Sequence, residues 1–390
     1  MVQYRKQVIA LFFLVLLWPN IAVSKSIEFV ILTVGALIIL FNDSIEADAL
    51  VKCVSLFTIV GVISWIKAIF TQEFTLERII AALILCVIWF VAVIIYDLFR
   101  KININWDRIS FVFFVNYMIW IASAILFLVF VKLGIASEIY HIEYNRARFD
   151  GWFEYSTLNV PFAIMHSTFA SFFVWRRTHN KLLVILCYML QWIPLYYTYS
   201  RSGYVLVALQ MVGYIFYFLL MAFKKRKVIK KGISLIFICL IPVLPIFGYV
   251  IFKAFNMLIG LREGSNISRM YIYTETIDKF IENPLIGNGI KSYTAIGYPL
   301  GSHCMYLGFL YRVGIIGAGI ILFGIAVTIK KIWECRKIDD FMWVSSFVNV
   351  LFMLAFAIFE DLDGEYWLLC MFFFYLGILQ NSSVFENKKL

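Results

Sequence analysis

Long apolar runs separated by short polar connections dominate the chain. A helix needs about 20 consecutive apolar residues to cross a bilayer, and runs of this order recur from end to end. The pattern predicts twelve apolar segments, at 8–23, 27–41, 49–70, 79–99, 109–131, 157–175, 182–199, 203–223, 232–252, 304–329, 341–359 and 366–380. The second and the last are short enough to tilt or to lie partly in the interface. We therefore predict an all-α, polytopic membrane protein with about twelve transmembrane helices, forming one membrane domain over residues 1–390.

The composition agrees with lipid as the solvent. Hydrophobic residues make up 63% of the 390 positions and charged residues 15%, whereas soluble domains have about 45–50% and about 25%. This difference excludes an ordinary cytosolic enzyme, a disordered chain and a disulfide-rich secreted scaffold. The seven cysteines are scattered without a CxxC pair and lie mostly in apolar runs. We therefore expect neither a disulfide framework nor a zinc site.

The net charge of +10 does not indicate a nucleic-acid-binding protein, because the positive charges form short clusters between apolar runs. If twelve helices alternate, 20 of the 34 Lys and Arg residues fall on one side, 11 fall on the other and three lie within spans. The positive-inside rule makes the richer side cytoplasmic. Both termini are then cytoplasmic.

The opposite, external side receives two long connections, at 132–156 and 253–302. The second, with 50 residues, is longer than chain connection requires. A tight turn at 200–203 and an acidic loop at 360–365 lie on the same side. No soluble catalytic domain or nucleotide-binding loop accompanies them. Any chemistry is therefore expected at the external rim.

The longer connection contains an amphipathic pattern. Ser268 is a suitable N-cap for a helix that begins near Arg269. Tyr273, Ile277 and Phe280 or Ile281 then form one apolar face, and the helix is expected to stop near Asn283, before Pro284. We predict an external helix lying on the membrane surface, followed by a flexible turn at 287–289.

Two arginines on the external side stand out. Arg201 lies between aromatic residues at the mouth of two helices, where a cation is costly unless it is paired or hydrated. Arg269 lies in the first turn of the predicted helix, where the helix dipole favours anions, which suggests an anionic partner from elsewhere. The alternatives are an interfacial arginine that reaches toward the headgroups and a solvated surface arginine.

Three further residues are candidates. His303 directly precedes the tenth span and has the chemistry of a general base or hydrogen-bond donor near neutral pH. Arg146 and Arg148, in the first external loop, suit contact with phosphate or sugar. The alternative for both arginines is pairing with acidic residues of the same loop.

Several motifs together resemble the O-antigen polymerase and O-antigen ligase superfamily. They are the SRSG turn at 200–203, the Ser-Arg pair at 268–269, the ENPLIGNG run at 282–289, HxxYL at 303–307, GIIG at 314–317 and RFxGxF at 148–153. Three places depart from the family pattern. Cys304 follows the histidine where the family usually has Asn, and Arg312 stands where it often has an acid. The Pro-Asn that usually follows the Arg-x-x-Gly stretch is replaced by Glu154-Tyr155-Ser156.

The resemblance implies a GT-C-type helical glycosyltransferase that uses a glycan on undecaprenyl diphosphate, presented at the outer face of the bacterial inner membrane. Arg201 and Arg269 would neutralise the leaving diphosphate, and His303 would orient or deprotonate the acceptor hydroxyl, with inversion at the sugar. The other substrate-contacting residues would be Arg146, Arg148, Tyr306 and Arg312. We expect no metal and no cofactor.

The activity that we expect is repeat-unit polymerisation, in which a lipid-linked glycan is transferred to a lipid-linked repeat unit. The alternatives are an O-antigen ligase with a lipid A-core acceptor, a polysaccharide flippase and a structural membrane subunit. A transporter should carry its polar groups near the bilayer midplane, whereas here they concentrate at the external rim. Expected partners are membrane lipid, the lipid-linked oligosaccharides, a chain-length regulator and a flippase.

Overall fold

The computed structural model describes most of the chain between residues 25 and 381. The described residues are 9, 12, 25–71, 75–102, 105–136, 142–143, 146–151, 153, 156–225, 263–290, 292–294, 297–337 and 340–381. Almost all of the predicted segment 8–23 and the whole of 232–252 lie outside them, so the number of twelve helices stays a prediction.

The other ten predicted segments coincide with helices. The helices are α2 (Lys25–Asn42), α3 (Ala49–Thr71), α4 (Leu76–Lys101), α5 (Trp106–Lys132), α7 (Asn159–Thr178), α8 (Lys181–Met189), α9 (Trp192–Thr198), α10 (Arg201–Lys225), α13 (Glu263–Glu282), α14 (Met305–Glu334), α15 (Phe341–Phe356) and α16 (Tyr366–Gln380). The seventh segment is divided into α8 and α9. The described elements also include a hairpin of two short strands, β1 (Ile142–Glu143) and β2 (Arg146–Ala147), and a 3-10 turn at Ser156–Leu158.

Six of the described helical segments are long and apolar enough to cross a membrane, and three apolar helices are shorter. Polar side chains define several of their starting points. Asn105, Asn180 and Asp340 cap α5, α8 and α15 by accepting hydrogen bonds from backbone N–H groups of the first turn. These caps satisfy donors that have no partner within a helix. The helix-rich membrane fold is thus confirmed for the described residues.

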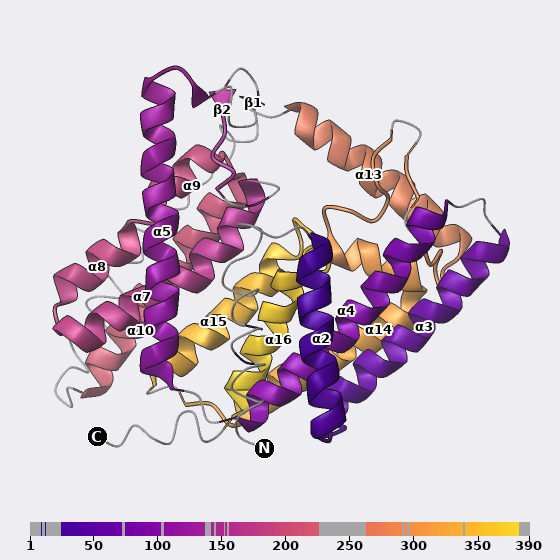
Figure 1. The fold of residues 1–390 in the computed structure, drawn as a ribbon, viewed down its shortest axis with the longest axis horizontal. Helices are drawn as coiled ribbons and strands as arrows, with labels where there is room; N and C mark the ends of the chain where they lie inside the picture. Colours follow the sequence, from indigo (N-terminus) through magenta and orange to yellow (C-terminus); the bar gives the residue numbers. More distant parts are fainter. Residues whose placement is uncertain are drawn as a thin grey trace.

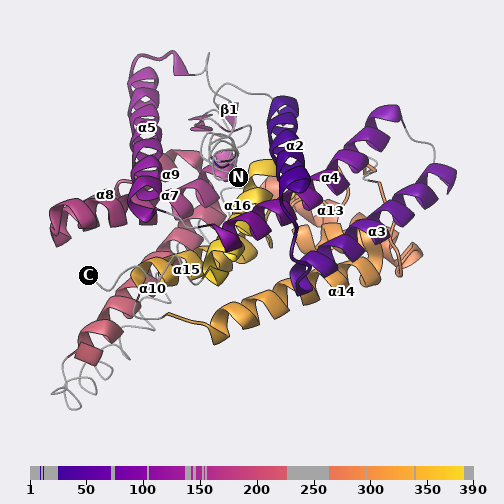
Figure 2. The same cartoon turned by 60° about the horizontal axis from the view of Figure 1, so that its bottom comes forward.

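The helices form two groups on either side of a central pair (Figure 1). The α3–α4 hairpin packs against α14, with α13 beside α14, in one group. In the other, α5 and α8 pack on α7, and α9 and α10 adjoin them. Helices α15 and α16 lie between the groups, as the turned view also shows (Figure 2). The candidate residues are distributed over both groups.

Helix α16 is the centre of the bundle and not an interfacial segment. Every residue from Trp367 to Leu379 is buried, and the helix packs against α4, α15 and α14. A helix that is hydrophobic all round is typical of a buried position. With 15 residues, it is one of the apolar helices that are shorter than a full span.

The described parts of the two long connections lie at one end of the bundle. The β1–β2 hairpin and α13 are both at the upper end in Figure 1, whereas the α4–α5 connection and the end of α10 are at the lower end. The segments that the charge pattern assigns to opposite sides therefore lie at opposite ends. The assignment of the upper end to the outside stays a prediction.

Candidate functional site

A break in α14 organises the backbone of the site. Gly314 has φ 64° and ψ −169°, which interrupts the helix and leaves backbone groups on both sides without helical partners. The segment Pro284–Gly289 supplies them. Four backbone hydrogen bonds join the two: Asn288 N to Tyr311 O (2.7 Å), Gly289 N to Arg312 O (2.8 Å), Ile315 N to Pro284 O (2.8 Å) and Ile316 N to Leu285 O (3.2 Å).

This docking explains two glycines of the motifs. A Cβ on Gly314 would lie 2.3 Å from the Leu285 carbonyl oxygen, and one on Gly289 would lie 2.3 Å from the Ser64 carbonyl oxygen of α3. Both have positive φ, which glycine adopts without strain. The predicted turn forms, but the prediction that it is flexible is wrong, because its backbone is bonded into α14. The ENPLIGNG and GIIG motifs are thus one structural unit.

Helix α13 differs from its prediction at the N-terminus. It runs from Glu263, so Ser268 is inside the helix, where its hydroxyl donates to the Tyr298 hydroxyl (3.3 Å), and is not the N-cap. Arg269 therefore lies in the second turn. The buried face contains Ile272 and Thr276, and Ile277 of the predicted face is 42% exposed. The buried face of α13 differs from the predicted one because the helix packs against α14.

Three charged or polar side chains meet beside α13. Glu360, from the loop before α16, accepts a hydrogen bond on Oε1 from Arg269 Nη2 (3.0 Å), and its Oε2 lies 3.0 Å from His303 Nδ1. A carboxylate only accepts hydrogen bonds, so His303 must donate from Nδ1. When the imidazole is neutral, Nε2 is then unprotonated and available as a base. His303 is 39% exposed and Glu360 16% exposed, so the histidine is accessible and its partner is mostly buried.

The backbone of His303 is also held in an unusual conformation. Its φ is 60°, a region that non-glycine residues rarely adopt and that is often found at functional sites. The Tyr273 hydroxyl of α13 donates to the His303 carbonyl oxygen (2.7 Å). Burial raises the pKa of Tyr273 to about 12, so the phenol keeps its proton at neutral pH. Helix α13 thus positions His303 as well as supplying Arg269.

Arg312 lies inside the bundle. Its Nη2 donates to Asp363 Oδ2 (2.8 Å), and the side chains are 6% and 0% exposed. Trp89 Nε1 donates to the same oxygen (3.3 Å), and Arg312 Nε donates to Gly308 O (3.1 Å). A buried charge requires such partners. This pairing accounts for an arginine where the related family often has an acid.

The described part of the connection at 132–156 is bonded to the end of α9, just before α10. Arg148 donates to the Thr198 carbonyl oxygen through Nε (3.2 Å) and Nη2 (2.9 Å), and to the Ser156 hydroxyl. Arg146 stands opposite Glu143 in the hairpin. The RFxGxF motif is therefore bonded to the end of α9, two residues before the SRSG motif, and Arg148 acts as a brace there.

Arg201 is the first residue of α10 and is half-buried. The preceding Tyr199 has φ 52°, and the Ser200 hydroxyl accepts from Gly203 N (3.4 Å). Backbone N–H groups at a helix N-terminus favour anions, so Arg201 stands where a phosphate would be stabilised. Tyr306, by contrast, donates from its hydroxyl to the Leu354 carbonyl oxygen (2.8 Å), which directs that group into the bundle.

The structure therefore brings Arg269 and His303 together through Glu360, and Arg148 and Arg201 to one turn. Sequence reasoning missed Glu360 and Asp363 as site residues. The sequence did contain a signal for them. The acidic run at 360–365 lies on the same predicted side as the candidate cations and contains no Lys or Arg that could pair with its acids.

The fold and this rim of paired charges define a multi-pass α-helical membrane protein with a polar site at one end of its helices. Residues 182–322 match the family model described as O-Antigen ligase. The match confirms the resemblance to the O-antigen polymerase and ligase superfamily. It includes Arg201, Arg269 and His303, and excludes Arg148 and the acidic loop. A comparison with curated proteins gives no match.

Proposed function

We propose that the protein is a repeat-unit polymerase that transfers a glycan from undecaprenyl diphosphate onto a second lipid-linked repeat unit. The observation that carries the proposal is the contact of one carboxylate, Glu360, with both His303 and Arg269. Through it an imidazole and a guanidinium group contact the same carboxylate at the edge of an apolar bundle. A reaction at that edge suits a substrate that is part lipid and part sugar.

The proposed reaction is a displacement at the anomeric carbon. The acceptor hydroxyl attacks C1 of the donor sugar while its proton passes to His303 Nε2. The C1–O bond to the diphosphate breaks, and the configuration at C1 inverts. Arg269 and Arg201 stabilise the charge that develops on the diphosphate, since guanidinium groups bind phosphate oxygens bidentately. Glu360 is a positioning residue that holds His303 in the reactive tautomer.

The proposal places the site on the periplasmic face of the bacterial inner membrane, with both termini in the cytoplasm. Within the described residues, no group of three or more His, Cys, Asp or Glu side chains is arranged to hold a metal ion, and the two arginines supply the charge that a metal would provide. Arg146 and Arg148 are the further residues that we propose to contact the glycan donor. A chain-length regulator and a flippase are the proposed protein partners.

A ligase is the second candidate, because the matching family model carries that description. The glycan phenotype of a deletion strain separates the two. Single repeat units on lipid A-core mean that polymerisation is lost. Lipid-linked polymer accumulating beside bare core means that ligation is lost. Repeat units that never reach the outer face would contradict both and indicate a flippase.

A further inference from the structure

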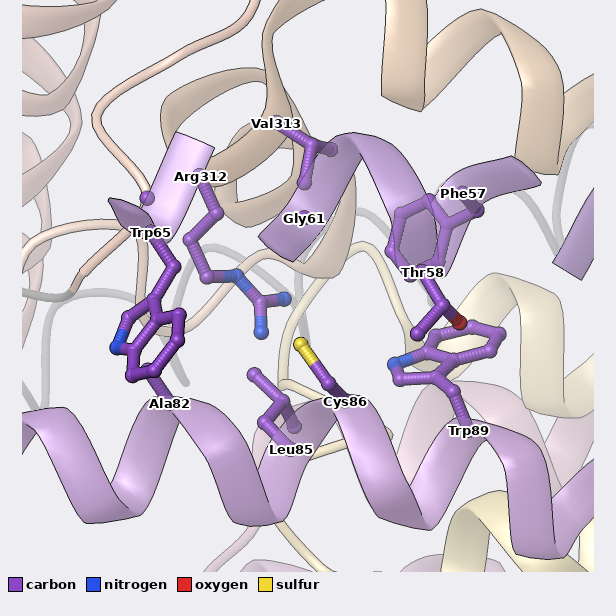
Figure 3. Close-up of a pocket in the computed structure, with 11 residues that line it drawn as sticks. Phe57, Thr58, Gly61, Trp65, Ala82, Leu85, Cys86, Trp89, Arg312 and Val313 are labelled. Carbon is purple, nitrogen blue, oxygen red and sulfur yellow. The ribbon is translucent and has the colours of Figure 1, made fainter. Parts of the chain in front are cut away.

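A small apolar pocket lies between α3, α4 and the break in α14 (Figure 3). Its volume is about 40 Å³. Aromatic and aliphatic side chains of the two helices form the walls, including Trp65, Leu85 and Trp89, and Val313 of α14 closes one side. Cys86 and the Arg312 guanidinium also face the pocket.

The charge of this pocket excludes an anion as its ligand. Arg312 is already paired with Asp363 at 2.8 Å, so the cation is neutralised by a fully buried carboxylate. The rest of the wall is almost entirely apolar. Desolvating a phosphate against such a wall would be unfavourable, whereas hydrocarbon gains free energy on contact with it. The chemistry therefore favours an apolar chain.

The position of the pocket indicates which chain. Arg312 follows Met305, the first residue of α14, by seven residues, so the pocket lies about 10 Å along the helix from the end that directly follows His303 and Cys304. The flanking helices expose aliphatic residues such as Ile59, Ile63 and Leu83, as lipid-facing helices do. An amphiphile whose head group is held at His303 and Arg269 would place the start of its hydrocarbon at this depth.

We propose that the pocket binds the first isoprene units of the polyprenyl chain of the lipid-linked substrate. The proposal rests on the proposed function, since it takes the diphosphate to lie beside His303. The pocket has room for about three groups of the size of a water molecule, which suits a methyl branch and its neighbouring carbons. A straight acyl chain has no branch to fill it, so the pocket distinguishes the polyprenyl carrier from phospholipid.

Cys86 provides a native reporter of occupancy. It is half-buried on the pocket wall, whereas Cys335, just beyond the other end of α14, is exposed and serves as the matched control. The rate of N-ethylmaleimide addition to each cysteine would be measured by mass spectrometry on purified protein in nanodiscs. We expect undecaprenyl diphosphate to slow addition to Cys86 at least fivefold and to leave Cys335 unchanged. Equal protection by phosphatidylglycerol or by inorganic diphosphate, or no protection, overturns the proposal.

Gly61 allows a second test without chemical labelling. A Cβ there would lie 3.6 Å from Cys86 Sγ and 3.7 Å from Val313 Cγ1, so Gly61→Ala fits at ordinary contact distance and Gly61→Leu fills the pocket. Gly319→Leu is the control, because nothing lies within 4 Å of a Cβ on Gly319. We expect Gly61→Leu to raise KM for the polyprenyl-linked donor about tenfold. This rise corresponds to roughly two methylene groups of the polyprenyl chain that are no longer buried in the pocket. Gly61→Ala should raise it about two- to threefold, and kcat should be unchanged.

The two proposals fail in different ways. If labelling of Cys86 is protected but no transfer activity exists, the pocket still binds a polyprenyl chain and the proposed enzyme function is wrong. If transfer depends on His303 while Cys86 is never protected and Gly61→Ala has wild-type KM, the enzyme function stands. The chain then lies elsewhere, and the assignment of the pocket is wrong.

Discussion

The residue that the structure adds to the site, Glu360, gives the most discriminating prediction. Glu360→Gln keeps the shape of the side chain and removes its charge. Each charge-assisted hydrogen bond contributes about 1.5–3 kcal/mol and a neutral one about 0.5–1.5 kcal/mol, so roughly 1 kcal/mol is lost for each of the two contacts. The contact with His303 counts at the low end, because that side chain is 39% exposed and solvent screens it. We expect turnover to fall about 10- to 50-fold.

The assay is polymer formation from a synthetic lipid-linked repeat unit by purified protein, with thermal unfolding measured on the same samples. Glu282→Gln is the matched control. Glu282 ends α13 and pairs with Lys279 (2.8 Å), but both side chains are about half exposed, so this change should leave turnover unaltered. Wild-type turnover in Glu360→Gln, or an equal loss in the control, would refute the positioning role of Glu360.

Four further results are expected. Arg201→Lys keeps the charge but loses the bidentate fork, so polymer yield should drop at least tenfold with expression intact, and a near-normal yield removes Arg201 from the diphosphate site. His303→Gln retains a hydrogen-bonding group but not a base, and turnover should fall about 10²–10⁴-fold; wild-type turnover contradicts the catalytic role. Gly314→Ala should lower the unfolding temperature, because its Cβ would lie 2.3 Å from the Leu285 carbonyl oxygen, whereas Gly319→Ala should not; equal temperatures would show that the α14 break tolerates a side chain. Added chelator should leave polymerisation unchanged, and its inhibition would indicate a required metal.

Much of the fold follows from the sequence because hydropathy is a local property. The ten described helical segments begin and end close to the limits of the apolar runs, since any such run in lipid must pair its backbone groups internally. The motifs around Arg201, Arg269 and His303 were recognisable for a similar reason, because each is a short contiguous stretch. The local pattern gave a wrong helix start at Ser268. This residue is a suitable N-cap, but α13 packs on α14 and begins five residues earlier, at Glu263.

Only the tertiary structure determined which residues contact each other across the bundle. Glu360 is 91 residues from Arg269 and 57 from His303, and no spacing rule relates such positions. The break in α14 likewise depends on a segment more than 20 residues earlier, which supplies the missing backbone partners. The composition of α16 is compatible with either lipid or protein around it, and the neighbouring helices α4, α14 and α15 decided that it is buried. The apolar runs thus determined that this chain is a bundle of membrane helices, and three-dimensional packing determined which charges meet, because a buried charge is stable only beside the partner that packing brings to it.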